Sequence, residues 1–280
     1  MNIYRKIQKV ITGQNAVDGA GVKLVRVIGR YDVRDFDPFL MLDAFDSRNK
    51  EDYIKGFPWH PHRGIETVTY LVSGEIEHGD SLGNNGSIKD GGCQWMTAGS
   101  GIIHQELPKP SERLLGVQLW LNLPSADKMT EPKYRDLSVE KIPVAVEEKG
   151  KVHIISGHYK GMEGATQGEH VKLLYLDVEL EPGCIWEVNT DPASTAFAYV
   201  LQGRGDFQPE GDGNISEKHG ILFGQGDTLR VKASEEGVRF LLFSGKPLRE
   251  PIAWGGPIVM NTRQELEQAF RELDENTFIK

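Results

Sequence analysis

Two histidines, His60 and His62, lie one residue apart in the stretch FPWHPHRGIETVTYLVSGEIEH, just before a run rich in β-branched residues. Alternate residues of a β-strand point to the same face, so both imidazoles can reach one point inside a β-sheet protein. A second pair with the same spacing, His104 and Glu106, follows in the stretch GSGIIHQE. Two strands that each offer two ligands to one face supply three imidazoles and one carboxylate. That donor set suits a divalent transition metal with coordination positions left open for water or substrate.

The residues around these pairs leave two questions open. A histidine pair on a strand can also consist of ordinary core side chains, and one such pair alone is a weak signal in a chain with 8 histidines. Glu66 competes with Glu106 for the carboxylate role, because it follows His62 at an even spacing and Gly64 can turn the chain between them. We expect the remaining histidines, which have no paired ligand nearby in the sequence, to be surface or core residues: His78, His153, His158, His170 and His219.

Other catalytic motifs are absent from the sequence or incomplete. No GxSxG, Walker or GxGxxG pattern occurs in a strand-to-helix context. Ser100 lies close to His104 in the sequence, but a nucleophilic triad also needs a partnered base and an orienting acid, and no residues can be assigned to those roles. Cys93 lies between the two ligand pairs, and we expect it to be a buried, unreactive thiol. A metal site is therefore the chemistry that the sequence favours.

The composition argues against several other classes of protein. The formal net charge is −9, and the densest basic stretch, 5–9, is too short for a nucleic-acid-binding arm, so direct nucleic-acid binding is not expected. The chain has 2 cysteines and no CxxC pattern, which favours a reducing compartment over a disulfide scaffold. The N-terminal stretch MNIYRKIQKV lacks an apolar signal region, and no run approaches the roughly 18 apolar residues of a membrane helix. We expect a cytoplasmic protein without membrane contact.

Short runs of alternating apolar residues, broken by Gly, Pro, Asn and Asp, dominate the chain and predict an all-β fold. The helical pattern is strongest at 262–273, where TRQE forms a capping box and apolar residues recur at helical spacing. A shorter helical turn is expected within 125–134. The clearest strand candidates are 22–28, 67–72, 116–121, 173–180 and 240–243.

The segment 141–168 is rich in charged residues and glycine, and we expect it to connect two β domains, at 1–140 and 169–280. A weak internal repeat supports a duplication. YLVSGE, from Tyr70, and YVLQGR, from Tyr199, share an aromatic residue, two aliphatic residues, a polar residue, glycine and a charged residue. The prediction is a duplicated β-barrel, with a C-terminal helix attached to the second barrel.

At these residues the sequence resembles the pirin family. GFPWHPHRGIETVTY at 56–70 is similar to the first metal motif of the pirins, and QWMTAGSGIIHQE at 94–106 is similar to the second. DPFLMLD at 37–43 and GPIVMNT at 256–262 are also pirin-like, so the resemblance spans nearly the whole chain. It implies a bicupin, in which two cupin β-barrels face each other and only the N-terminal barrel binds metal.

The resemblance also implies a ligand set and a cofactor. The metal ligands of the family fall on His60, His62, His104 and Glu106, which leaves Glu66 as a neighbour of the site. The metal is usually iron, here Fe(II), although cupin sites of this kind also accept zinc, manganese, nickel, copper or cobalt.

The activity that the resemblance implies is that of a metal-dependent dioxygenase, which cleaves quercetin-like flavonols with O2. Glu106 would then be both a metal ligand and the catalytic proton acceptor for the flavonol 3-hydroxyl. Other pirins are similar to interaction proteins, which implies the alternative of a redox-sensitive regulator that binds a transcription factor or a metabolic enzyme. We expect a monomer, because two barrels in one chain are self-contained.

Overall fold

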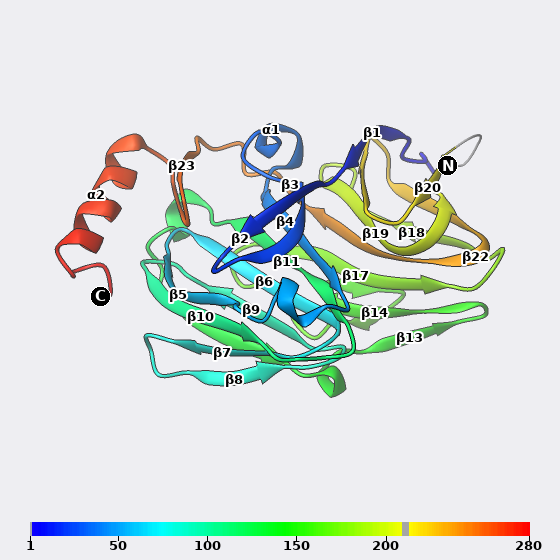
Figure 1. The fold of residues 1–280 in the computed structure, drawn as a ribbon. Helices are drawn as coiled ribbons and strands as arrows, with labels where there is room; N and C mark the ends of the chain where they lie inside the picture. The colour runs from blue at the N-terminus through cyan, green and yellow to red at the C-terminus, as the bar shows by residue number, and fades with distance from the viewer. Residues whose placement is uncertain (1, 209–212) are drawn as a thin grey trace. The chain divides into compact units, whose positions relative to one another are not determined.

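The alternating apolar runs become paired antiparallel strands in the computed structural model of the chain, which describes residues 2–208 and 213–280 (Figure 1). The predicted all-β fold with a short C-terminal helix is confirmed. The chain forms two compact units, each built from several segments. The first unit consists of 14–33, 38–140 and 248–280, and the second unit consists of 1–13, 34–37 and 141–247.

The first unit contains a seven-stranded sheet and a four-stranded sheet, so its strands form a jelly-roll-like arrangement rather than one closed barrel. The seven-stranded sheet has the order β12-β9-β6-β11-β4-β3-β2. Its strands are β2 (Gln14–Asp18), β3 (Val22–Ile28), β4 (Phe39–Ser47), β6 (Ile65–Ser73), β9 (Cys93–Thr97), β11 (Leu114–Asn122) and β12 (Lys133–Leu137). The four-stranded sheet, in the order β5-β10-β7-β8, consists of β5 (Phe57–His62), β7 (Ile76–Asp80), β8 (Asn85–Ile88) and β10 (Ile102–Pro108).

The second unit is built on a nine-stranded sheet whose main path is β1-β21-β19-β22-β17-β14-β13, with β18 paired to β22 and β20 paired to β19. Its strands are β1 (Ile7–Thr12), β13 (Val144–Glu147), β14 (Gly150–Ser156), β17 (Leu173–Leu180), β18 (Ile185–Asn189), β19 (Thr195–Asp206), β20 (Asn214–Ser216), β21 (His219–Phe223) and β22 (Thr228–Gly245). The short elements of the chain are α1 (Val33–Phe36), the 3-10 turns Lys50–Asp52, Ser125–Asp127 and Val139–Lys141, and the strands β15 (His158–Tyr159) and β16 (Met162–Glu163).

The two large sheets repeat one strand order. β9-β6-β11-β4-β3-β2 in the first unit corresponds to β21-β19-β22-β17-β14-β13 in the second. The sequence repeat that begins at Tyr70 and Tyr199 falls on β6 and β19, which occupy the same place in the two orders. Each repeat reaches a glycine in the left-handed region, Gly74 with φ 111° and Gly203 with φ 71°, where a side chain would be strained. The duplication expected from the repeat is therefore present in the fold.

The ends of the chain pair with segments that are distant in sequence. Strand β1, near the N-terminus, pairs with β21 of the second unit, and the C-terminal segment 248–280 belongs to the first unit. The segment 141–168, which we expected to be a connector, contains β13 and β14, and β14 continues the sheet by pairing with β17. The domain limits expected at 140 and 168 stay a prediction, whereas the compact units have discontinuous limits because strand pairing joins distant segments.

The C-terminal segment 248–280, called the tail below, carries β23 (Ala253–Gly255), β24 (Ile258–Met260) and the helix α2 (Arg263–Asp274). The hydroxyl of Thr262 accepts a hydrogen bond from the backbone N–H of Glu265, whose carboxylate accepts one from the backbone N–H of Thr262. The predicted capping box is therefore confirmed, and α2 begins at Arg263, one residue after the N-cap Thr262. The inward side of α2 packs into a small core of Ile258, Met260, Ala269 and Phe278.

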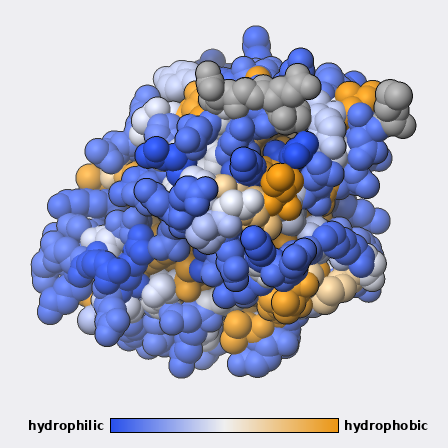
Figure 2. Space-filling model, turned by 90° about the vertical axis from the view of Figure 1, so that its right-hand side faces the viewer, coloured by the Kyte–Doolittle hydropathy of each residue, from blue (hydrophilic) through white to orange (hydrophobic). Residues whose placement is uncertain are grey.

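The surface of the molecule is largely hydrophilic in the view of Figure 2, and hydrophobic residues gather there only in small, separate areas. Scattered apolar residues of this kind are normal on a protein surface and do not mark a binding face.

In the described part of the chain, no helix has the length and the apolar character needed to cross a membrane.

We expect the ion pair between Arg63 and Glu272, with N···O 2.7 Å, to make stability depend on pH in acid. Burial raises the pKa of Glu272, but hydrogen bonds from Gln268, Arg63 and Lys280 outweigh burial and lower the pKa from 4.5 to about 2. Such a carboxylate stabilises the fold above its unfolded pKa, and the contribution is lost as the pH falls toward the folded pKa. The difference in unfolding free energy between wild type and Glu272→Gln, measured in urea, should therefore shrink from pH 4.5 to about 2. A difference that stays constant over this range would contradict the prediction.

Candidate metal centre

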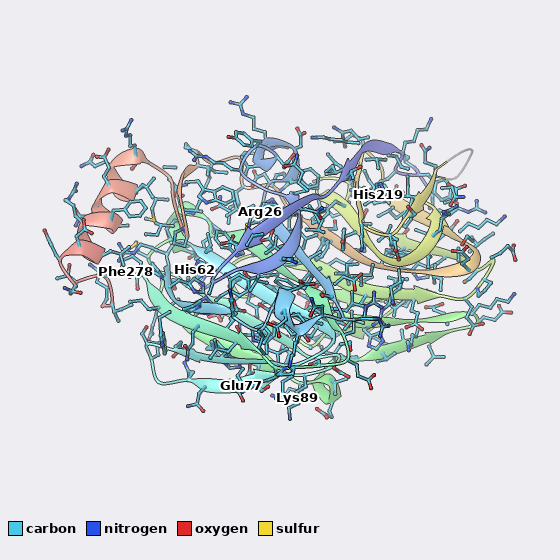
Figure 3. All side chains as sticks on the ribbon, viewed as in Figure 1. Arg26, His62, Glu77, Lys89, His219 and Phe278 are labelled. Carbon is cyan, nitrogen blue, oxygen red and sulfur yellow. The ribbon has the colours of Figure 1, made fainter. Side chains whose placement is uncertain are left out.

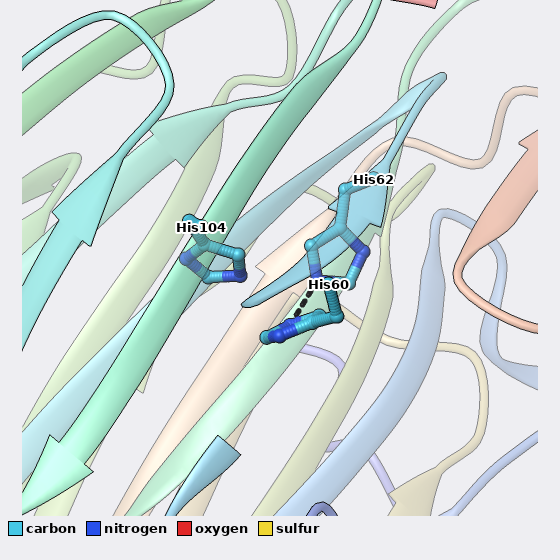
Figure 4. Close-up of side chains that lie close together, drawn as sticks. All are labelled: His60, His62 and His104. Carbon is cyan, nitrogen blue, oxygen red and sulfur yellow. Dashed lines mark hydrogen bonds between the residues drawn. The ribbon is translucent and has the colours of Figure 1, made fainter. Parts of the chain in front are cut away.

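Strands β5 and β10 bring the predicted histidines together. They pair antiparallel, with His104 opposite His60 and Ile102 opposite His62. Because alternate residues of a strand share a face, the three imidazoles project to the same side of this sheet and approach one another (Figure 4). The nitrogen atoms that can bind a metal all lie within 4.8 Å of one another. The structure thus gathers three of the four predicted ligands into one cluster.

Backbone carbonyl groups orient two of the three rings. Nδ1 of His60 lies 2.9 Å from the carbonyl oxygen of Pro58, and Nδ1 of His62 lies 3.1 Å from the carbonyl oxygen of Pro257. A carbonyl oxygen only accepts, so in the neutral rings Nδ1–H donates and Nε2 keeps its lone pair. The two Nε2 atoms lie 3.0 Å apart, within hydrogen-bond distance, as the dashed line in Figure 4 marks. With the proton of each neutral ring on Nδ1, neither Nε2 has a hydrogen to donate. Two lone pairs at that distance repel each other, and a cation that both can bind removes the repulsion.

Burial keeps two of the imidazoles neutral. His62 and His104 are each 1% exposed. Burial, and then the neighbouring His60, lower the pKa of His62 to about 3, and burial lowers the pKa of His104 well below its usual value. Both ring nitrogens of His104 are buried and have no hydrogen-bond partner among the described residues. Since buried polar atoms are nearly always satisfied, and since neutral imidazole is the form that binds metal, these residues fit a divalent transition metal.

Glu106 follows His104 on the inward face of β10, and neighbouring side chains hold its carboxylate. It accepts a hydrogen bond from the hydroxyl of Thr69 at 3.1 Å and from Nε2 of Gln118 at 2.8 and 3.0 Å. The pairing of β10 with β5 shifts register between His104 and Glu106, which marks a bulge at this point. The role of Glu106 as the fourth metal ligand stays a prediction.

Glu66, the competing carboxylate, lies on the other face of β6. Residues 66 and 69 have opposite parity on this strand, so Glu66 points away from the side on which Thr69 meets Glu106. Its Oε1 accepts a hydrogen bond of 2.6 Å from the hydroxyl of Thr97 and lies 3.6 Å from the guanidinium of Arg135. This geometry makes Glu66 part of a separate buried polar cluster.

A cavity of about 590 Å³ reaches the histidine cluster, and His60, His62 and Gln118 form part of its wall. Trp120 and Trp254 add aromatic surface to the same wall, with their ring centroids 6.0 Å apart. A volume of this size is typical of a small-molecule site.

Charged side chains also line the cavity. Arg26 on β3 and Asp43 on β4 form a two-pronged ion pair, with N···O distances of 2.9 and 2.7 Å. Figure 3 labels Arg26 and His62, which lie on different strands of the first unit. The lining of the cavity therefore combines aromatic side chains with a paired arginine and aspartate.

Several residues of the site were not predicted from the sequence. Gln118 carried a signal, because it is a polar residue in the middle of the largely apolar run LLGVQLWLN of β11. Thr69 and Trp120 are ordinary strand residues in the sequence, and nothing in the local pattern separates them from core residues. The carbonyl group of Pro257 is a backbone group, so its contact with His62 depends on tertiary structure alone.

The second unit fills the corresponding positions with apolar side chains. β18 pairs antiparallel with the first half of β22, in the way that β5 pairs with β10, and Trp186 lies opposite Val231 while Val188 lies opposite Leu229. All four side chains are buried in the core of this unit. The inward positions that carry the histidines of the first unit are thus occupied by tryptophan and valine, which cannot bind a metal.

The five other histidines lie outside the cluster. His78 is buried and contacts the ring of Tyr134, with centroids 4.7 Å apart, and His153 has a pKa that burial lowers. Cys93 is buried, and burial raises the pKa of its thiol, as expected for an unreactive cysteine.

Comparison with known proteins agrees with the fold and the motifs. Residues 21–121 match the family model described as Pirin, and residues 175–279 match the model of the Pirin C-terminal cupin domain. The crystal structure of a quercetin 2,3-dioxygenase from Acinetobacter baumannii is similar, with a TM-score of 0.89, 31% sequence identity and 98% of each chain covered. A duplicated cupin fold with this strand order is a bicupin, so the predicted class is confirmed.

Two curated relatives identify the family. A Pirin-like protein from Caulobacter vibrioides is 42% identical over 277 residues, which cover 98% of this chain and 99% of the relative. A protein from Pseudomonas aeruginosa, whose name provisionally assigns it quercetin 2,3-dioxygenase activity, is 42% identical over 278 residues and 97% of each chain. The chain belongs to the pirin family, as its motifs predicted.

The two buried carboxylates should respond differently to removal of their charge. Glu106→Gln should weaken metal binding by about 10-fold or more, because Glu106 is the predicted fourth ligand, whereas Glu66→Gln should bind metal like wild type. Competition with a chelating dye measures both affinities. The reverse order of effects would make Glu66 the carboxylate ligand and contradict the prediction.

Removal of the buried side chain of Trp186 should destabilise the second unit without changing metal binding. Trp186 is buried, and its Nε1–H donates a hydrogen bond of 2.7 Å to the hydroxyl of Tyr159. Trp186→Ala should therefore lower the free energy of unfolding by about 3–5 kcal/mol, measured in urea. The bound metal per chain, measured by elemental analysis, should stay the same as in wild type, and a decrease would show that the second unit takes part in metal binding.

Proposed function

We propose that this protein is a metal-dependent dioxygenase of the pirin type, which cleaves quercetin-like flavonols with O2. The observation that carries the proposal is the convergence of His60, His62 and His104 in one cluster, of which His60 and His62 line a cavity large enough for a small molecule. The similar Acinetobacter structure is that of a quercetin 2,3-dioxygenase, and the Pseudomonas relative bears the same activity in its name.

His60, His62 and His104 would hold the metal, with Glu106 as the fourth ligand. When bound, a divalent transition metal supplies a Lewis acid and a redox centre for O2. The proposal takes Fe(II) as the ion, from the family resemblance, and the same donors also suit zinc, manganese, nickel, copper or cobalt. It takes a cytoplasmic location from the two cysteines, Cys93 and Cys184, which are both free thiols.

In this proposal Glu106 takes the proton of a substrate hydroxyl. Its carboxylate accepts hydrogen bonds from the hydroxyl of Thr69 and the amide of Gln118, which fix the direction of its oxygen atoms. Gln118 is itself oriented by Trp120, whose Nε1–H donates to the amide oxygen at 3.3 Å. With its oxygen occupied by Trp120, the amide of Gln118 presents its NH2 group to Glu106. The carboxylate is thereby held against Gln118, which lines the cavity.

The lining of the cavity suits a flat aromatic substrate. Trp120 and Trp254 contribute aromatic surface, and Phe57 and Met41 also contribute apolar surface. Aromatic surfaces of this kind hold planar rings by offset or edge contacts and exclude water from the reacting groups. A flavonol combines planar rings with a hydroxyl that can reach the histidine cluster.

The proposal is tested by following metal, O2 and flavonol together. Purified protein is loaded anaerobically with Fe(II), quercetin is added, and O2 uptake and loss of the flavonol absorbance are recorded. We expect uptake that depends on Fe(II) and falls more than about 100-fold in His104→Ala, because a metal ligand is lost. His219→Ala, which removes a histidine of the second unit, serves as the matched control and should keep the wild-type rate.

Two outcomes would contradict the proposal. Uptake that persists in His104→Ala at low metal content would remove the histidine cluster from the reaction. Stoichiometric metal binding without flavonol turnover would favour the alternative role, in which the protein binds a transcription factor or a metabolic enzyme and turnover is incidental.

A further inference from the structure

The partner of His62 is unusual in its distance along the chain. Nδ1 of His62 contacts the carbonyl oxygen of Pro257, which is 195 residues away, whereas the partner of His60 is Pro58, only two residues away. The hydrogen bond from Nδ1–H to the carbonyl oxygen fixes both the tautomer and the direction of the ring, and so the direction of Nε2. One of the three imidazoles therefore depends on the tail for its orientation.

The next residue, Arg63, lies just after β5 and anchors the tail. It is 2% exposed. Its guanidinium donates to the carbonyl oxygens of Ser100 at 2.6 Å and Phe278 at 3.0 Å, and lies 2.7 Å from the carboxylate of Glu272. It also stacks over the ring of Phe278, 4.1 Å from the ring centroid. Phe278 is labelled in Figure 3, next to the end of α2.

A second set of contacts closes the tail against the segment that follows His62. The backbone N–H of Val259 donates to the carbonyl oxygen of Arg63 at 3.1 Å. The buried ammonium group of Lys128 bridges the carbonyl oxygens of Gly64 and Val259, each at 2.8 Å. Gly64 has φ +75°, and a Cβ at this position would lie 2.0 Å from the carbonyl oxygen of Val259. The two segments are thus packed too closely to admit a side chain between them.

We propose that the tail, 248–280, is a positioning element of the metal centre, and that metal binding and docking of α2 stabilise each other through Arg63 and Glu272. Arg63 is covalently next to His62, and Pro257 lies two residues before Val259, so both ends of the His62 contact are fixed by the anchored segments. Loosening the anchor lets the Pro257 carbonyl move away from Nδ1, and the metal then loses one preoriented ligand. By linkage, a bound metal must strengthen docking of the tail by the same factor.

The inference rests on the metal binding of the proposed function and does not depend on the dioxygenase activity. A tail that served only stability would change the unfolding free energy of the protein and leave its metal affinity and the ligand geometry unchanged. A positioning role predicts a change in the metal affinity of the folded protein. The two roles therefore differ in a property that can be measured without substrate or O2.

The test uses the full chain and Co(II), whose visible absorption reports the geometry of its ligands. Glu272→Gln removes the charge that pairs with the buried Arg63. Glu267→Gln, on the same helix, removes the charge of an exposed pair with Arg263 and is the matched control. Phe278→Leu leaves the ion pair in place and removes the ring over Arg63, so it serves if Glu272→Gln does not fold.

We expect Co(II) affinity, from competition with a chelating dye, to fall about 10-fold in Glu272→Gln and in Phe278→Leu, with a changed Co(II) spectrum, and to stay at the wild-type value in Glu267→Gln. In hydrogen–deuterium exchange of wild type, Co(II) should slow exchange of the amides of 263–280. Wild-type affinity in both anchor variants, or exchange in the tail that ignores Co(II), would overturn the inference. Failure of wild type to bind Co(II) would overturn the proposed metal centre itself and the coupling with it.

Discussion

The meeting of three imidazoles on one face of two antiparallel strands is the constraint on which the site depends. It follows from strand geometry, because His60 and His62 are two residues apart on β5 and His104 lies opposite His60 on β10. Burial makes this arrangement costly without a partner. The ring nitrogens of His104 are shielded from water and have no hydrogen-bond partner in the described chain, and the Nε2 atoms of the other two rings face each other. An unsatisfied buried polar group costs about 1–3 kcal/mol, and a bound cation at the proposed metal centre would offset that cost.

In the second unit the same strand order encloses an apolar core instead of a histidine cluster. Its corresponding interior holds Trp186, Val188 and Val231, which pack into a continuous apolar core. In the first unit the equivalent space is divided between the histidines, a buried polar group around Glu106 and a cavity of about 590 Å³. The described apolar residues of the first unit are buried in separate clusters, one around Tyr53, one around Trp120 and the small core of the tail. The duplicated scaffold thus separates a binding unit from a unit with a filled core.

Local pattern was sufficient to predict much of this structure. Apolar alternation placed the strands, the capping box at Thr262 placed α2 within one residue, and the spacing of the histidines placed them on one face. Spacing could not decide whether Glu66 or Glu106 is the carboxylate ligand, since both lie at an even distance from a histidine. The family resemblance favoured Glu106. The hydrogen bond of Glu66 with Thr97 agrees with that preference. Pairing of β1 with β21 and packing of the tail in the first unit could not be predicted locally. Both join segments that are far apart in sequence, and the residue pattern of an edge strand does not predict which strand it pairs with.

The contrast between His60 and His62 has a consequence for how the site is assembled. His60 takes its orientation from Pro58, two residues away, so its ring can be set as soon as β5 forms. His62 takes its orientation from Pro257, and that contact requires the tail to have packed against the first unit. Closing a loop of this length has an entropic cost that local contacts do not share. Arg63, whose buried charge is matched by Glu272 of the tail, makes an undocked tail unfavourable because the guanidinium would lose its carboxylate partner. The residue beside a predicted metal ligand therefore ties completion of the three-histidine cluster to completion of the fold.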